Sequence, residues 1–245
     1  MALQQRPGLV AGPARKQRPL LPALQWVAVA GAVMGAVLYS NWLLELVFTH
    51  TLPNPDEFIS ELAAADQRYG AWFRGGDRAA AIVVVIATVV ALINSWGGRW
   101  HRMGWWAAGA FAVGTLLDST VWTLVCAPHS DAACAARDAS GAVPAGHKLH
   151  LLSTVISVIG AVLSSIAFVV ADYVDLNAAP VRRLGRVVLT AVIGTNVWMG
   201  IAVAVDSTNS SGQAGIAQQA ELAAMAGWLI YIALRTARTP AESTT

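Results

Sequence analysis

The sequence predicts an all-α polytopic membrane protein, a six transmembrane helix bundle with a short amphipathic helix in the first outer loop. Three observations predict this class. Of the 245 residues, 56% are hydrophobic and 12% are charged, whereas an ordinary soluble domain has about 25% charged residues. Six separate apolar runs are long enough to cross a hydrocarbon core. The Lys and Arg residues cluster in the segments that connect these runs.

Each apolar run is as long as the roughly 17 to 25 helical residues that a bilayer core of about 30 Å requires. Helices are the expected spanning structure because lipid offers no partner to exposed backbone groups, and the ten-residue alternation of a membrane barrel is not seen. The predicted spans are residues 24–48, 78–96, 103–126, 149–173, 184–205 and 219–237.

The first span follows a basic segment, residues 1–23, that is rich in Pro and Gly. A secretory signal has an apolar region of only about 7 to 15 residues that ends in a small-residue cleavage site. The run 24–48 is longer and carries Trp42 near its far end. We therefore expect a flexible cytoplasmic tail over 1–23, one transmembrane domain over 24–237 and a cytoplasmic tail over 238–245.

The distribution of Lys and Arg predicts the orientation, because cytoplasmic connections carry an excess of both. The N-terminal tail, the 97–102 turn, the 174–186 region and the C-terminus are basic, and the 206–218 loop has no Lys or Arg. The 49–77 loop has more acids than bases. We expect a multi-pass protein of a bacterial inner membrane with both termini in the cytoplasm.

The first outer loop contains the signature of a helix start. Asn54 can cap the helix, Pro55 suits the first helical position, and Asp56 and Glu57 suit the first turn. Apolar residues over 58–63 share one face, with Ser60 and Glu61 between them. The pattern predicts a short amphipathic helix on the outer surface, either as a lid over the space between the helices or as a simple cap.

Polar side chains gather in the outer half of the predicted bundle. Asp118 lies about eight residues inside the outer end of the third span, and a charged group in the bilayer usually faces the bundle interior and finds a partner. We expect an outward-facing polar pocket. The candidate ligand-binding residues are Ser40, Asn41, Glu45, Asp118, His150, Ser153 and Glu221.

His147 and His150 are three residues apart, so both imidazoles share a helix face if the helix has begun by residue 147. Together with Asp118 they have the ligand types of a His-His-carboxylate zinc site. The alternative interpretation pairs His150 with Asp118 or a helix terminus and leaves His147 in the headgroup region. No other cofactor is expected.

Cys126 and Cys134 enclose a short loop on the predicted outer side. The oxidising environment there favours a disulfide that fixes the mouth between the third and fourth spans. Two free thiols are the alternative.

Two short motifs resemble a bacterial family of six-helix integral membrane proteins, the domain of unknown function 998. They are Ile59, Ser60, Glu61, Leu62 and Ala63, and a loop with Cys, Pro and Asp that leads into Leu149 and His150. The resemblance spans most of residues 30–235. It implies the six-helix fold and carries no established activity.

Three functions remain open from the sequence. The first is a non-enzymatic protein that binds or moves a small lipophilic or lipid-like ligand through the outer pocket. The second is an intramembrane metal hydrolase that uses Asp118, His147 and His150. The third is a scaffold of a membrane complex with a membrane protein partner, in which small-residue faces at Gly31, Gly35 and Gly160 pack helices closely. We expect membrane lipids as partners and no nucleic acid.

Overall fold

The computed structural model describes residues 22–49, 57–94, 98–174, 179–209 and 213–238. The described residues form helices and no strand, which confirms the predicted all-α class. The long helices are α1 (Pro22–Tyr39), α3 (Gly70–Asn94), α4 (Arg99–Thr120), α6 (Ala145–Val174), α7 (Ala179–Asn209) and α8 (Ala214–Ala237). The short ones are η1 (Asn41–Leu44), α2 (Glu45–Thr49), η2 (Ile59–Ala63) and α5 (Ala132–Ala139).

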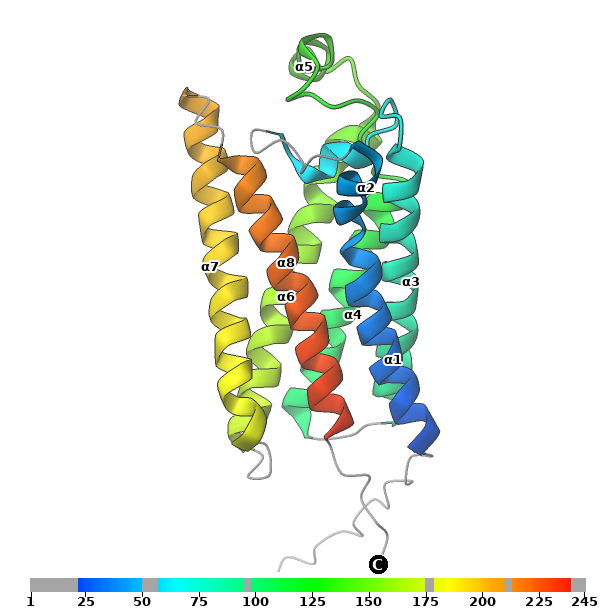
Figure 1. The fold of residues 1–245 in the computed structure, drawn as a ribbon, viewed down its shortest axis with the longest axis vertical. Coiled ribbons are helices and arrows are strands. Elements are labelled where there is room, and N and C mark those ends of the chain that lie inside the picture. Colours follow the sequence, from blue (N-terminus) through cyan, green and yellow to red (C-terminus); the bar gives the residue numbers. More distant parts are fainter. Residues whose placement is uncertain (1–21, 50–56, 95–97, 175–178, 210–212, 239–245) are drawn as a thin grey trace, which may run out of the picture.

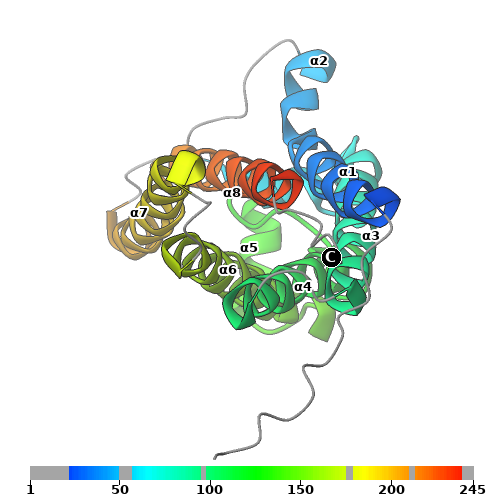
Figure 2. The same ribbon diagram turned by 90° about the horizontal axis from the view of Figure 1, so that it is seen from below.

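The six long helices stand side by side in a closed ring (Figures 1 and 2). Each packs against the next in the order α1, α3, α4, α6, α7 and α8, and α8 packs against α1. Helix α1 begins and α8 ends at the same end of the ring, which we call the terminal end. The short elements α2, η2 and α5 lie at the opposite end, which we call the α5 end.

Glycines let neighbouring helices approach closely. A Cβ atom at Gly31 would lie 2.8 Å from the Ala87 Cβ atom, and one at Gly160 would lie 2.4 Å from the Phe111 backbone nitrogen. Small residues of this kind permit the tight van der Waals packing on which helix association in lipid depends. Gly31, Gly35 and Gly160 therefore pack closely against helices of their own chain.

Aromatic side chains fill the centre of the ring. Phe111 lies 5.1 Å from Trp228 between ring centroids, and Phe168 lies 5.9 Å from Trp105 and 6.5 Å from Tyr231, each pair edge to face. The outward faces instead expose large apolar side chains such as Ile93, Trp106 and Val197. Exposed apolar surface on every side of a helical ring is the pattern of a protein that lies in lipid.

Several helices are long and apolar enough to cross a membrane. Among the described residues they are α3, α6, α8 and residues 181–205 of α7. Helix α1 and the segment 41–48 form a fifth candidate if they are one span with a bend of 42°. Helix α4 is not among these candidates.

Several helix boundaries differ from the predicted ones; α1, for example, ends at Tyr39 and not at residue 48. Helix α3 begins at Gly70 and not at residue 78, so Asp77 belongs to a helix and not to the outer loop. Helix α4 ends at Thr120, which places Asp118 two residues from the helix end. Helix α5 was not predicted. Its N-cap is Asp131, whose side chain accepts a hydrogen bond of 2.8 Å from the Ala133 backbone.

The predicted amphipathic surface helix is only partly described. Its expected start, Asn54 to Asp56, lies outside the described residues, and the rest of the segment forms the single 3₁₀ turn η2. Ile59 and Glu61 of this turn are buried. The described part of the segment is thus a short 3₁₀ helix that packs its buried residues on the α5 end of the bundle.

Candidate functional site

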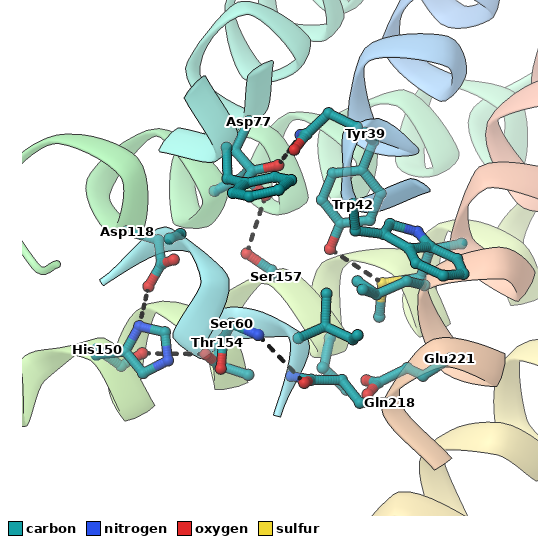
Figure 3. A pocket seen from close by; sticks show the side chains of 18 residues that line it. Tyr39, Trp42, Ser60, Asp77, Asp118, His150, Thr154, Ser157, Gln218 and Glu221 are labelled. Atoms are coloured by element: carbon teal, nitrogen blue, oxygen red, sulfur yellow. Dashed lines mark hydrogen bonds and ion pairs between the residues drawn. The ribbon is translucent and has the colours of Figure 1, made fainter. Parts of the chain in front are cut away.

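A pocket of about 90 Å³ lies at the α5 end, between α1, α3, α4, α6 and α8 and beneath η2 (Figure 3). Three carboxyl groups line it, those of Asp77, Asp118 and Glu221, and no Lys or Arg is among the lining residues. The remaining polar and aromatic lining side chains are Tyr39, Asn41, Trp42, Ser60, Phe73, Thr115, His150, Thr154, Ser157 and Gln218.

Asp118 is held by two partners from α6. The Nδ1 atom of His150 lies 2.6 Å from its Oδ1 atom, an ion-pair distance when the imidazole is protonated. The ring nitrogen is not aligned for a regular hydrogen bond. The fully buried Ser153 hydroxyl group donates to the same oxygen at 2.6 Å and also approaches the His150 carbonyl oxygen at 2.7 Å. The contacts join α4 to α6 at the pocket.

Asp77 is held by an amide from the end of α1. The Nδ2 atom of Asn41 donates to Asp77 at 2.7 Å and to the Leu38 carbonyl oxygen at 2.9 Å. One amide group therefore satisfies a terminal carbonyl of α1 and a carboxylate of α3. Gly76 makes the approach possible, because a Cβ atom there would lie 2.6 Å from Asn41 Nδ2.

Glu221 differs from the other two acids. Its side chain is 6% exposed and extends from α8 into the pocket (Figure 3), and within the described chain its carboxylate accepts no hydrogen bond. Gln218, three residues earlier on the same helix face, is occupied, since its Oε1 atom accepts from the Ser60 backbone at 3.3 Å. Within the described residues, the pocket thus contains a buried acidic group without a protein partner.

The pocket is closed towards the centre of the ring. The Tyr39 hydroxyl group donates to the sulfur of Met225 at 3.6 Å, and the Tyr39 ring packs on Phe111 at 5.2 Å. Phe111 packs in turn on Trp228. These contacts form an aromatic floor, so the polar space is confined to the α5 end and is not continued as a channel along the ring axis.

Glu61 fastens η2 over the pocket. Its Oε1 atom accepts a 2.8 Å hydrogen bond from the His129 backbone and lies 2.6 Å from the His129 ring nitrogen. Arg74 of α3 donates to the Ala63 carbonyl oxygen from the other side. Glu61 is therefore a structural residue that ties the cover of the pocket to the loop after Cys126.

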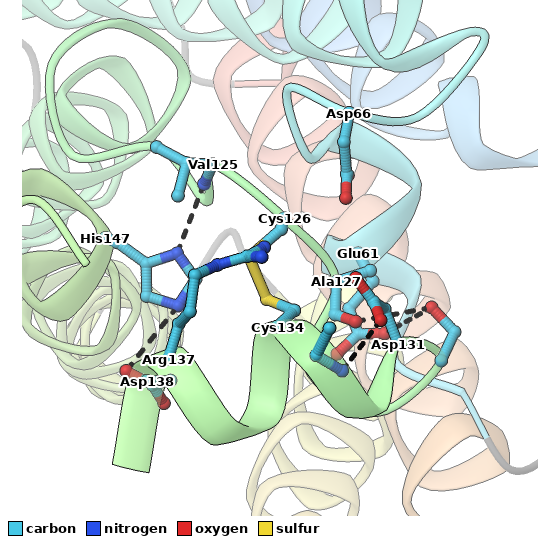
Figure 4. Close-up of a disulfide and its surroundings, with 12 residues drawn as sticks. Glu61, Asp66, Val125, Cys126, Ala127, Asp131, Cys134, Arg137, Asp138 and His147 are labelled. Carbon is cyan, nitrogen blue, oxygen red and sulfur yellow. Dashed lines mark hydrogen bonds and ion pairs between the residues drawn. A yellow bond between two sulfur atoms is a disulfide. The ribbon is translucent and has the colours of Figure 1, made fainter. Parts of the chain in front are cut away.

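Cys126 and Cys134 form a disulfide in the structure, and both are buried (Figure 4). Beside it, the buried His147 accepts a hydrogen bond of 3.1 Å from the Val125 backbone at Nδ1 and lies 3.7 Å from Asp138 through Nε2. The disulfide and His147 together attach α5 and the preceding loop to the start of α6.

The predicted zinc ligands are not brought together. His147 faces the disulfide loop and is not part of the pocket, while His150 is paired with Asp118. Among the described residues, no group of three His, Cys, Asp or Glu side chains is placed to hold a metal ion. The spacing of three residues places the two imidazoles on neighbouring parts of α6. His147, however, contacts Val125 and Asp138 outside the pocket.

The other candidates divide into lining and non-lining residues. Asn41, Asp118, His150 and Glu221 line the pocket as predicted, and Ser153 supports it from behind Asp118. Ser40 and Glu45 do not line it. Ser40 bonds its hydroxyl group to Ala36 in its own helix, and Glu45 begins α2, which follows the bend after α1.

Asp77, Tyr39 and Gln218 are pocket residues that the sequence patterns did not predict. Gln218 stands three residues before Glu221 on one helix face, a spacing that could have revealed it. Asp77 follows two glycines and an arginine, which made the start of α3 look like a loop.

Comparisons with known proteins place the chain in a family. No curated protein and no solved structure matches it. The family model described as "Protein of unknown function (DUF998)" matches residues 29–235, a range that includes parts or all of each of the six long helices of the ring. The chain therefore belongs to the domain of unknown function 998 family.

Proposed function

We propose that the protein is a non-enzymatic membrane protein that binds a small amphiphilic ligand in the pocket at the α5 end. One observation carries this proposal: a polar space with three carboxyl groups lies among apolar helices, closed below by aromatic rings and covered by η2. Ionisable groups among membrane helices are costly and generally mark a binding site or pathway. Lipids or lipid-like molecules are the ligands at hand in that setting.

We propose further that all six long helices cross the membrane, with the terminal end in the cytoplasm of a bacterial cell. Helix α4 has 22 residues, about 33 Å at a rise of about 1.5 Å per residue, and packs between α3 and α6. The terminal end carries seven described arginines, which are Arg99, Arg102, Arg182, Arg183, Arg186, Arg235 and Arg238. This excess supports a cytoplasmic location.

Ligand binding can be tested with three probes that share a hexyl chain: hexylamine, hexanol and hexanoate. The protein is placed in phosphatidylglycerol nanodiscs and its melting temperature is measured with each probe, because a ligand that binds the folded state raises Tm. Val158→Phe fills the pocket from α6. Val155→Phe, on an exposed part of the same helix, is the matched control.

We expect at least one probe to raise the Tm of the wild type and of Val155→Phe equally, and to leave Val158→Phe unchanged. If no probe shifts the Tm, or if the shift survives in Val158→Phe, the pocket does not bind such ligands and the proposal is wrong.

A further inference from the structure

The carboxyl groups and aromatic side chains that line the pocket indicate a chemical class of ligand. This inference rests on the proposed function. The lining contains three carboxyl groups against one histidine, and that histidine is already paired with Asp118. Asp77 has a neutral amide as its partner. Glu221 is 6% exposed and accepts no hydrogen bond from the described residues. Within the described chain, two acids of the pocket therefore lack a cation.

A buried carboxylate without a partner is unfavourable, because the apolar surroundings do not replace the water that solvated it. The charge can be balanced by a cation in the same space. No Lys or Arg lines the pocket: Arg78 donates to the Ser119 carbonyl oxygen at the end of α4, and Arg74 donates to the Ala63 carbonyl oxygen of η2. A cation that comes with the ligand can take this place.

Aromatic rings stand beside these acids. Tyr39 of α1, Trp42 of η1 and Phe73 of α3 line the pocket, and Figure 3 shows Tyr39 between Asp77 and Trp42 in that view. Aromatic faces attract organic ammonium groups through cation–π interactions, and quaternary ammonium is commonly recognised by aromatic rings in this way. Carboxylates with aromatic rings favour an organic ammonium ion over a metal ion, which would need several oxygen ligands around one point.

The size of the pocket limits what enters it. A cavity of about 90 Å³ admits a few water molecules or one small head group, and it does not admit a whole lipid. An attached apolar chain would have to extend between the helices or out of the α5 end.

We propose that the pocket binds the ammonium head group of an amine or quaternary ammonium compound, with Asp77 and Glu221 as the anionic partners and Tyr39 and Trp42 as the aromatic ones. Asp118 stays paired with His150 and forms the wall between α4 and α6. The compound can be a free amine or a lipid with an ammonium head group.

The test compares choline with 3,3-dimethylbutan-1-ol, a neutral molecule of nearly the same shape, and hexylamine with hexanol. Binding to the full chain in phosphatidylglycerol nanodiscs is measured by calorimetry, so that no lipid of the disc brings an ammonium group. The variants are Glu221→Gln and Asp77→Asn. Asp66→Asn, an exposed acid at the same end that does not line the pocket, is the charge-matched control. The Tm of each variant shows that it is folded.

We expect the cations to bind at least tenfold more tightly than their neutral counterparts. Glu221→Gln and Asp77→Asn should each lose tenfold or more of this affinity, and Asp66→Asn should bind as the wild type does. If the neutral compounds bind equally well, the carboxyl groups hold protons and the inference is overturned, while ligand binding itself stands. If no compound binds, the inference and the proposed function both fail.

A second arm identifies the source of the ammonium group. The protein is reconstituted in an equal mixture of phosphatidylethanolamine and phosphatidylglycerol, extracted, and weighed by native mass spectrometry. Retention of phosphatidylethanolamine that is lost in Glu221→Gln supports the inference with a lipid as ligand. Equal retention of both lipids, together with tight binding of choline or hexylamine, supports it with a free amine as ligand.

Discussion

At the scale of single residues, each acid of the pocket has a specific neighbour, with one exception. Asp118 is paired with His150 and Ser153, Asp77 with Asn41, and Glu221 has no protein partner among the described residues. Asp118 alone has an imidazole beside it, because the partner of Asp77 is a neutral amide, so Asp77 and Glu221 are the acids that a cationic group from outside can pair with.

Gly75 and Gly76 offer a matched pair of tests for the Asn41 contact. A Cβ atom at Gly75 would meet nothing within 4 Å, whereas one at Gly76 would lie 2.6 Å from Asn41 Nδ2. Gly75→Ala should stabilise the protein by up to about 1 kcal/mol through helix propensity. Gly76→Ala should be less stable than Gly75→Ala by about 1 to 2 kcal/mol, because it displaces Asn41 from Asp77 and leaves a polar group unpaired.

Reversible unfolding in mixed micelles measures both changes. Equal free energies of unfolding for the two variants would show that Asn41 can move aside without loss, and that its bond to Asp77 does not shape the pocket.

The same residues show what the sequence could and could not predict of the site. Asp118 and His150 could be paired because an acid inside an apolar run needs a partner and a histidine begins the next run. Asp77 could not be placed, since Gly75 and Gly76 mimic a loop when only composition is read. The role of Gly76 is to leave room for Asn41, which comes from another helix. The order of residues does not reveal that these two helices meet there.

At the scale of elements, the two ends of the ring are held by different means. The α5 end is joined by the disulfide, by Glu61 of η2 and by His147 of α6. The terminal end is joined by Asp172 of α6, which is fully buried and accepts from Tyr231 and Arg235 of α8. The backbone carbonyl of Asp172 also accepts from Arg182 of α7 at 2.7 Å. Arg235 is thus a buried, paired residue.

Asp172→Ala tests this joint. Removal of the carboxylate leaves Arg235 buried without its counter-ion, and loss of one partner of a buried pair costs about 3 to 5 kcal/mol. Arg183→Ala, an exposed arginine of α7, should change stability by less than about 0.5 kcal/mol. The free energy of unfolding in mixed micelles checks both values. A loss below about 1 kcal/mol for Asp172→Ala would mean that the pair does not hold α6 to α8.

The elements also show which boundaries sequence patterns can give. The six apolar runs each coincide with one long helix, because lipid-facing helices are recognised by length and hydropathy. Helix α5 was missed because its Ala-rich, charged sequence has no apolar run, although Asp131 is a recognisable N-cap. The sequence predicted a short amphipathic helix resting on the bundle for the segment that contains η2, and the contacts of this turn with Gln218 and His129 hold it there.

At the scale of the whole molecule, the ring has two ends with different charge. Among the described residues, seven arginines and one acid, Asp172, lie at the terminal end. The α5 end contains the pocket, with its three carboxyl groups, and most of the other described acids. A ring with a basic end and an acidic end has the charge distribution of a protein oriented in a membrane by its basic residues. A cytoplasmic terminal end requires that the pocket lie on the opposite side of the membrane.

The most direct test of a ring of six crossing helices concerns α4, which does not meet the composition test for a span. It is the one long helix between residues 102 and 136, so if α4 crosses the membrane these two residues lie on opposite sides. Single cysteines are introduced as Arg102→Cys and Ala136→Cys, both exposed, and the native cysteines are bonded to each other. Cells are treated with a maleimide that cannot cross membranes. We predict that Ala136→Cys is labelled in intact cells and Arg102→Cys only after lysis. Labelling of both positions in intact cells, or of neither before lysis, would contradict a ring of six crossing helices.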